Sequence, residues 1–327
     1  MASVENDKDP RLPADDAVIT FRTDRSGISG RLVRLGITAD TILARHAAPD
    51  AASETLAHAL ALSALLGSVL PGEGKVILQA RSDGAVTFLV ADYEAPGQMR
   101  GYVRFDAEKI ADLEAEGRKS AAAGSLSTGH LAITVEQGQT AERYQGVVAI
   151  DGGCLSDVAT RYFEDSEGLA TFVRLAVARH FKAGDGIEPS GWHWRAGGMM
   201  LQHVAAERSA SASAPGKPAG ADDEDWVRVR LLGQTIEDHE LLDPTLTPER
   251  LLIRLFHEEG VIIEKSRPLT SYCRCSRERV LDVLKSFGSQ ELSDMHDEAG
   301  HISVTCEFCA TKYAFDPADI GAGDHSA

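Results

Sequence analysis

The sequence is poor in several features that would assign it to a specialised class of protein. Of its 327 residues only 6% are aromatic and only five are cysteine. Basic residues are the minority among the charges, 33 against 50 acidic ones, which gives a net charge of −17. A surface this acidic repels phosphate backbones, so the composition argues against general nucleic-acid binding. The 43% of hydrophobic residues is ordinary for a soluble globular chain.

Long hydrophobic runs are missing as well. The most apolar stretch, residues 56–70 (LAHALALSALLGSVL), is too short to cross a bilayer and contains His58. Residues 1–13 are polar and lack the apolar core of a secretory signal. No Walker motif or glycine-rich phosphate loop is present. We therefore expect a cytoplasmic protein without membrane contact and without ATP use, in which residues 56–70 belong to a buried helix.

The hydrophobic pattern predicts an α+β fold with three parts. These are an N-terminal domain of mixed sheet and helix, a helical linker region and a small C-terminal zinc-binding module. A chain of this length is long enough for two domains. The predicted divisions are residues 1–15 (flexible tail), 16–206 (α+β domain), 207–225 (flexible low-complexity linker), 226–267 (helical linker region), 268–320 (zinc module) and 321–327 (tail).

Apolar–polar alternation between glycine-containing turns predicts the strands of the first domain. The predicted strands are residues 17–23, 28–35, 75–80, 85–91, 98–104, 130–135, 145–150 and 199–205. Helices are expected at residues 53–70, with Ser53 as the N-cap, and at residues 166–180.

Composition changes sharply after the first domain. Residues 207–225 (ERSASASAPGKPAGADDED) contain no apolar residue larger than alanine, so burial cannot offset the entropy of ordering them. A helical pattern follows, with an apolar stripe at Leu231, Leu232, Ile236, Leu241 and Leu242. A further helix is expected to begin at the Thr247 cap with Pro248 in its first position, and the segment to end at Gly260.

Four of the five cysteines form two close pairs near the C-terminus. Cys273 and Cys275 are separated by thirty residues from Cys306 and Cys309. Two such pairs supply the four thiolates of a tetrahedral structural zinc site, with Zn–S distances of about 2.3 Å. The intervening pattern predicts helices capped by Ser276 and starting near Gly288, then strands at residues 301–305 and 312–315 joined by the 306–309 turn. We therefore expect one zinc ion per chain.

The same cysteines allow redox chemistry. Two cysteines in a C-x-C pair close a disulfide only with strain, and strained disulfides are the labile ones. The four sulfurs can therefore be metal ligands when reduced and form local disulfides when oxidised. Structural zinc contributes about 10–16 kcal/mol in small modules, against about 5–15 kcal/mol for the total stability of a domain. Loss of the metal is therefore expected to unfold the module.

The cysteine-containing C-terminal segment resembles the zinc-binding C-terminus of the heat shock protein 33 family, whose members are redox-regulated holdase chaperones. The residues that carry this resemblance read CRCSRERVLDVLKSF…CEFCATKYAFDPADI. Further matches in the same order are residues 98–101 (QMRG), 142–148 (ERYQGVV), 196–199 (AGGM), 201–202 (LQ) and 256–259 (FHEE). The resemblance covers nearly the whole chain. Residues 207–225 form a longer run than is usual in the family.

The resemblance implies a mechanism and a set of partners. Reduced protein is a nearly inactive monomer with zinc at Cys273, Cys275, Cys306 and Cys309. Oxidation forms the disulfides Cys273–Cys275 and Cys306–Cys309 and releases the zinc. The module and the helical linker then unfold, and residues 16–206 form a homodimer that binds unfolding client proteins. The resemblance thus implies a chaperone rather than an enzyme.

Two other functions remain open from the residues alone. A thiol–disulfide oxidoreductase would use Cys306 and Cys309, but it needs its C-x-x-C at the start of a helix, and this pair lies between two strand-like runs. A zinc-ribbon module that binds nucleic acid is disfavoured by charge, because residues 270–327 carry five basic and ten acidic side chains.

The remaining candidates are better explained by structural roles. Cys154 is expected to be a buried, inert thiol. His296 and His301 lie within the module, but four cysteines already complete a tetrahedron. Residues 192–194 (WHW) are expected to pack in a loop rather than to contact clients. A further set, considered as a catalytic triad, has no supporting motif: Ser63, Asp151 and His180.

Overall fold

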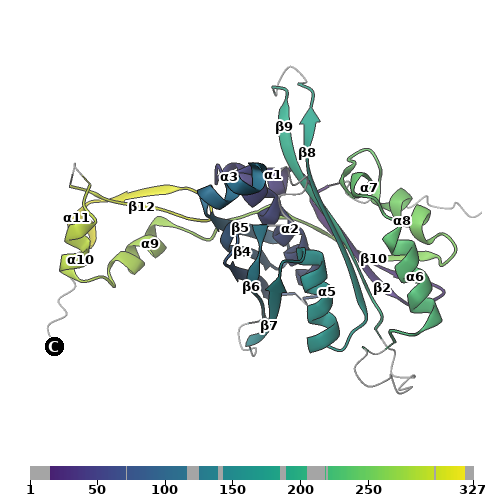
Figure 1. Ribbon diagram of the computed structural model, residues 1–327. Helices are drawn as coiled ribbons and strands as arrows, with labels where there is room; N and C mark the ends of the chain where they lie inside the picture. The colour runs from purple at the N-terminus through teal and green to yellow at the C-terminus, as the bar shows by residue number, and fades with distance from the viewer. Residues whose placement is uncertain are drawn as a thin grey trace, which may run out of the picture.

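The computed structural model describes residues 15–70, 72–115, 125–138, 143–184, 189–204, 218, 220–297 and 300–320. Within these ranges the chain forms two larger sheets, helices between and beside them, and a separate C-terminal module (Figure 1). The mixed architecture confirms the predicted α+β class. Among the described residues, no helix is both long enough and apolar enough to span a membrane.

The first sheet has five antiparallel strands in the order β10-β1-β2-β9-β8. Its central strands are buried, since all but the first residue of β2 are inaccessible. Its strands are β1 (Ala17–Thr23), β2 (Ser29–Leu35), β8 (Thr171–Lys182), β9 (Gly191–Gln202) and β10 (Val261–Pro268).

The second sheet has six strands in the order β11-β5-β4-β3-β6-β7. All pairs are antiparallel except β11 with β5. Its strands are β3 (Lys75–Ser82), β4 (Val86–Glu94), β5 (Gln98–Phe105), β6 (Thr128–Glu136), β7 (Arg143–Asp151) and β11 (Thr270–Ser271). The helices α1 (Ile37–Ala44), α3 (Ala107–Ala115) and α5 (Leu155–Ser166) accompany the sheets.

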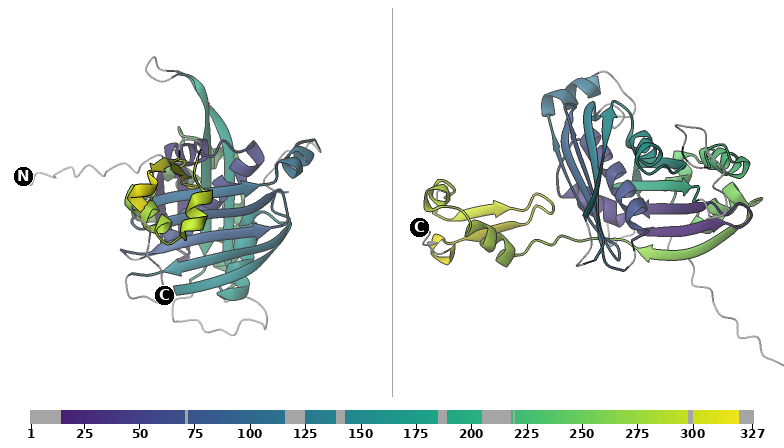
Figure 2. Two further views of the ribbon diagram at one scale, coloured as in Figure 1. Left: turned by 90° about the vertical axis from the view of Figure 1, so that its left-hand side faces the viewer. Right: turned by 90° about the horizontal axis from the view of Figure 1, so that it is seen from below.

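The helix α2 (Asp50–Gly67) lies between the two sheets and touches strands of both (Figure 2). Fifteen of its eighteen residues are buried, many of them alanine, which lets both sheets approach closely. At its end a Cβ on Gly67 would lie 2.0 Å from Cδ1 of Tyr93, so only glycine fits under that ring. The helix begins at Asp50, and the expected cap is wrong. Ser53 is buried inside the first turn, where its hydroxyl donates to the carbonyl of Ala48.

The outer face of the first sheet is covered by three linker helices (Figure 1). They are α6 (Glu224–Gln234), α7 (Asp238–Leu242) and α8 (Pro248–Phe256). Trp226, Leu241 and Leu251 pack there against Phe21 and Leu201. The hydroxyl of Thr247 accepts from the backbone N–H of Arg250, as the sequence predicts for the cap of α8.

The linker region is not helical throughout. After Gly260, at φ +71°, the β-branched run 261–263 starts β10, which pairs antiparallel with β1. Strand β11 then adds to the second sheet beside β5. The prediction of a helical region to residue 267 is therefore wrong for its last part, because long-range pairing with the N-terminal strand decides its conformation.

The prediction of a helix at residues 166–180 is also wrong. Helix α5 ends at Ser166, and β8 follows from Thr171 and pairs with β9 along its whole length. Strand β9 begins at Gly191, so residues 192–194 lie in a strand and not in a loop. The apolar residues of β8 resemble a helical face over a short window, and the partner strand overrides that local pattern.

Several predicted segments lie wholly or partly outside the described residues. These include the tail at residues 321–327, residues 1–14 of the N-terminal tail, and residues 207–217 and 219 of the low-complexity run. Where the structure describes residues at the ends of these segments, the prediction that they are flexible is wrong. Asp15 forms an ion pair with Arg195, and Asp223 caps α6 through the backbone N–H groups of Asp225 and Trp226.

Candidate metal centre

The C-terminal module is small and built as its sequence predicts. Helix α9 (Arg277–Leu284) starts at Ser276, whose hydroxyl accepts from the N–H of Arg279. Helix α10 (Ser289–Asp294) follows Gly288, as predicted. The hairpin of β12 (Ile302–Thr305) and β13 (Lys312–Phe315) leads to the short α11 (Pro317–Ile320). The module stands beside the second sheet (Figures 1 and 2).

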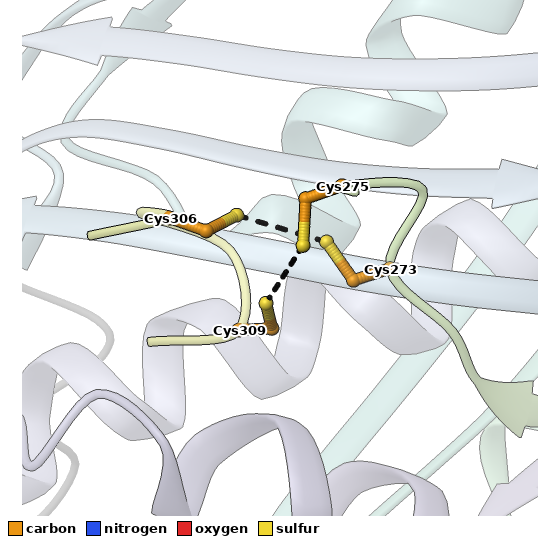
Figure 3. Close-up of side chains that lie close together, drawn as sticks. All are labelled: Cys273, Cys275, Cys306 and Cys309. Atoms are coloured by element: carbon orange, nitrogen blue, oxygen red, sulfur yellow. Dashed lines mark hydrogen bonds between the residues drawn. The ribbon is translucent and has the colours of Figure 1, made fainter. Parts of the chain in front are cut away.

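The fold brings the four paired cysteines together, as the sequence predicts. Cys273 and Cys275 lie in the extended segment after β11, and Cys306 and Cys309 lie at the turn between β12 and β13. Their Sγ atoms all lie within 4.8 Å of one another (Figure 3). Sγ of Cys273 is 3.7 Å from that of Cys306, and Sγ of Cys275 is 3.3 Å from that of Cys309.

This arrangement fits a tetrahedral metal site. Four sulfurs at about 2.3 Å from a central zinc would be separated from one another by about 3.8 Å. The two measured separations, 3.7 and 3.3 Å, are close to that edge. The cluster contains neither His296 nor His301. His296 instead forms an isolated bridge with Ile302.

Backbone hydrogen bonds shape the loop that carries Cys306 and Cys309. The N–H of Cys306 donates to the carbonyl of Thr311, and the N–H of Ala310 donates to the carbonyl of Cys306. Ala310 adopts φ +56°, a left-handed conformation that closes the turn. The C-x-x-C pair thus lies in a turn between strands, not at the helix start that the oxidoreductase alternative requires.

The four thiols are not electrostatically equivalent. Burial raises the pKa of Cys275 to about 12 and also raises the pKa of Cys306. Burial raises the pKa of Cys309 too, but hydrogen bonds from Thr311 and neighbouring thiols outweigh it and lower the pKa to about 6. The hydroxyl of Tyr313 lies 3.1 Å from Sγ of Cys275, and this hydrogen bond raises the pKa of Tyr313 to about 12. Cys309 therefore carries negative charge more readily than Cys275 or Cys306, which suits a cation-binding cluster.

The cysteine loop also touches the second sheet. Phe308 lies between Cys306 and Cys309 in the sequence. Its ring stacks on Arg100 of β5, with Cζ of Arg100 4.0 Å from the ring centroid. Tyr102 of the same strand lies 6.3 Å from that ring, centroid to centroid. Glu307 and Arg104 add an exposed ion pair at 3.5 Å.

The other cysteine pair is tied to the sheet by charge. Arg274, between Cys273 and Cys275, lies 3.4 Å from Glu94 and 3.6 Å from Asp92 of β4. Asp92 is almost fully buried and also accepts a 2.7 Å hydrogen bond from Nε of Arg100. Sequence reasoning missed this contact surface. The sequence signal for this contact surface was the presence of Arg274 and Phe308 inside the two cysteine motifs.

Other candidates identified from the sequence do not join a site. Cys154 is exposed at the N-cap of α5, so the prediction of a buried thiol is wrong; the preceding Gly152-Gly153 turn holds it at the surface. Its Sγ lies 3.1 Å from a carboxylate oxygen of Asp157, and burial of the sulfur itself still raises its pKa. Trp192 is 64% exposed and packs on Phe181 across the β8–β9 pair.

The residues considered as a triad are not assembled. The hydroxyl of Ser63 donates to the carbonyl of Leu60 within α2. Asp151 pairs with Arg161 at 2.7 Å. His180 lies opposite His193 in the β8–β9 ladder.

Comparisons with known proteins define the class. A protein-family model described as "Hsp33 protein" matches residues 16–316. A 33 kDa chaperonin of Caulobacter vibrioides is 39% identical over 303 residues, covering 93% of this chain and 95% of that protein. A 33 kDa chaperonin of Pseudomonas aeruginosa is 33% identical over 301 residues, covering 92% and 91%. The class of protein is therefore a chaperone.

The chain belongs to the Hsp33 family. The crystal structure of a 33 kDa chaperonin from Thermotoga maritima superposes with a TM-score of 0.72 at 20% sequence identity. The match covers 93% of this chain and 96% of the other, and it supports the fold described above. The family resemblance expected from the cysteine segment is thus confirmed.

Proposed function

We propose that the protein is an ATP-independent holdase whose activity is controlled by the redox state of its cysteines. In the reduced state a zinc ion is held by Cys273, Cys275, Cys306 and Cys309, and the chain is an inactive monomer. In the oxidised state the module and linker unfold, and the N-terminal domain dimerises and binds unfolding clients. The observation that carries the proposal is the four-sulfur cluster whose two loops contact the second sheet directly.

The proposal depends on a module that cannot stay folded without its metal. Its buried apolar side chains are only Leu284, Ile302, Phe315 and Ile320 among the described residues. Zinc, when bound, supplies four cross-links worth about 10–16 kcal/mol in small modules. Because the apolar core is so small, loss of the ligands removes most of the free energy that keeps the module folded.

Oxidation of the cysteines removes the zinc ligands. A peroxide-class oxidant accepts two electrons from each pair of thiols, one disulfide forms per pair, and the oxidant is reduced to water. We propose the local pairs Cys273–Cys275 and Cys306–Cys309, because each lies within one loop and can close as its loop is released. A sulfur that has entered a disulfide no longer binds metal as a thiolate, so zinc leaves with the oxidation.

The chain path connects the module to the linker helices. Only Tyr272 separates β11 from Cys273, and only Leu269 separates β10 from β11. Unfolding of the module removes the Arg274 and Phe308 contacts that support this segment beside β5. Release of the linker exposes the apolar face formed by Phe21, Leu32 and Leu201. That face supplies the surface for clients and for a second subunit.

The double variant Cys306→Ser/Cys309→Ser tests the proposal. It removes half of the ligands, so the module should unfold, while the first domain stays folded because it contains none of the four cysteines. We expect this variant to suppress aggregation of a heat-denatured client under reducing conditions, where the parent protein does not. The matched control Cys154→Ser should behave like the parent. A double variant that keeps a folded N-terminal domain but is inactive under both reducing and oxidising conditions would contradict the switch.

A further inference from the structure

A cavity of about 280 Å³ opens at the end of α2, between the two sheets and beside α5. It shares no lining residue with the cysteine cluster. Most of its wall is apolar and comes from α2, β3, β6, α5 and β9. The principal apolar lining residues are Leu66, Leu70, Val76, Ile133, Phe163 and Met200.

Among the described residues that line this apolar cavity, one is a buried cation. Arg31 of β2 is 8% exposed, and its Nη1 donates to Oε1 of Gln202 at 2.6 Å and approaches Sδ of Met200 at 3.6 Å. Burial lowers its pKa to about 10, which leaves the guanidinium charged at neutral pH. In the part of the chain that the structure describes, no carboxylate lies within 4.0 Å of this guanidinium, and Glu264 acts on it only from a greater distance.

The other buried arginines of the sheet are compensated differently. Arg195 forms an ion pair with Asp15 and donates to the carbonyl of Leu242. Arg34 donates to the carbonyls of Glu240 and Leu246. Among the described residues, Arg31 has one amide oxygen and a thioether as its close partners and no carboxylate within 4.0 Å. A buried guanidinium without an ion-pair partner favours an anion, and carboxylates match its geometry.

The polar groups at the mouth limit the charge of that anion. The hydroxyls of Tyr144 and Tyr162 each donate to Oε1 of Glu167 at 2.8 Å, and all three residues line the cavity. Glu167 therefore places an exposed negative charge, held by two hydroxyls, among the lining residues. It disfavours ligands that carry a second negative charge, such as dicarboxylates or phosphates.

We propose that this cavity binds a monocarboxylate with an apolar chain, the carboxylate on Arg31 and the chain against the apolar wall. At 280 Å³ the cavity has room for several water-sized groups, so it can admit a short acyl chain. A medium-chain fatty acid is a suitable probe of this size class. The inference does not depend on the redox switch, because none of the residues involved contacts the cysteines.

The probe is octanoate, added to the reduced, zinc-loaded full-length protein, with octanamide as a neutral ligand of the same shape. Binding is measured by titration calorimetry and by NMR of protein labelled with ¹³C at the methionine methyl groups. We expect one octanoate per chain and a shift of the Met200 methyl signal, without a shift of Met295 in the C-terminal module. Octanamide should bind at least tenfold more weakly.

Two variants locate the site. In Arg31→Met the affinity for octanoate should fall at least tenfold, to that of octanamide, whereas Arg31→Lys should keep most of the preference for the anion. In Val135→Trp the cavity is filled, so neither ligand should bind. The proposal is overturned by equal affinity for octanoate and octanamide, by an unmoved Met200 signal, or by octanoate binding unchanged in Arg31→Met. If Arg31→Met does not fold, the ligand comparison on the parent protein and Val135→Trp decide the question.

Discussion

The N-terminal domain and the C-terminal module obtain their stability from different sources. In the N-terminal domain α2 is buried between two sheets, and large side chains such as Tyr93, Leu56 and Leu60 are fully inaccessible. In the module α9 buries only Leu284, and four cysteines take the place of an extended core. Apolar burial persists under oxidation, whereas thiolate ligation would not. On the proposed function, the chain can therefore lose one region while keeping the other.

Removal of the metal should give the largest difference between the two regions. Chelation of zinc from reduced protein should unfold residues 273–320, because about 10–16 kcal/mol of ligation is lost from a module with a minimal core. Amide NMR signals of β12 and β13 should collapse to unfolded positions, while those of β3 and β4 stay dispersed. A module that keeps its dispersed signals after complete zinc removal would show that its apolar core suffices.

A cavity in the N-terminal core should have the converse effect. Leu60→Ala removes a fully buried side chain from α2 and should cost about 2–5 kcal/mol in the free energy of unfolding of that domain. Urea unfolding, followed by circular dichroism, measures this loss, and the zinc affinity of the module should be unchanged. Ile37→Ala is the matched control. Ile37 is 78% exposed, so its truncation should change stability by less than about 0.5 kcal/mol.

Acid should weaken the N-terminal domain through His58. Burial lowers the pKa of this half-buried histidine of α2 to about 4, although hydrogen bonding to the Glu54 carbonyl and the charge of Asp238 oppose the shift. The unfolded chain therefore binds the proton more tightly. The contribution of His58 is complete above pH 6.5 and is lost as pH falls toward 4, by about 2 kcal/mol at pH 5. Between pH 7 and pH 5, the free energy of unfolding of the parent should fall by this amount more than that of His58→Gln. If both proteins show the same pH dependence, His58 does not cause the loss of stability in acid.

Loss of a contact between the N-terminal domain and the C-terminal module should have the smallest effect on free energy. Phe308→Ala removes the stacking on Arg100, which we expect to contribute about 0.5–2 kcal/mol to docking. The thiols remain, so the variant should bind zinc normally but show faster hydrogen exchange in β11 and lose zinc at lower peroxide concentration. Glu307→Gln is the control, because its ion pair with Arg104 is exposed at both ends and should contribute about 0–1 kcal/mol. Identical peroxide sensitivity in Phe308→Ala and the parent would mean that docking does not restrain the switch.

The candidate metal site could be predicted from sequence almost completely. Cysteine spacing, the Ser276 cap and the short strands beside Cys306 are local features, and each was found where the sequence places it. The contact surface of the module was not predictable in the same way. Arg274 and Phe308 reach partners on β4 and β5 that lie more than 150 residues away along the chain.

The sequence by itself determined the α+β class, the pairing of four cysteines into one cluster and those elements whose caps and alternation are complete within a few residues, such as β1 and α8. Tertiary structure decided the conformation of β8 and β10, the exposure of Cys154 and the burial of Arg31. The physical reason is the range of the interactions involved. Caps, turns and ligand spacing act between neighbours in the chain. Strand pairing and burial are set by partners that only the folded chain brings together.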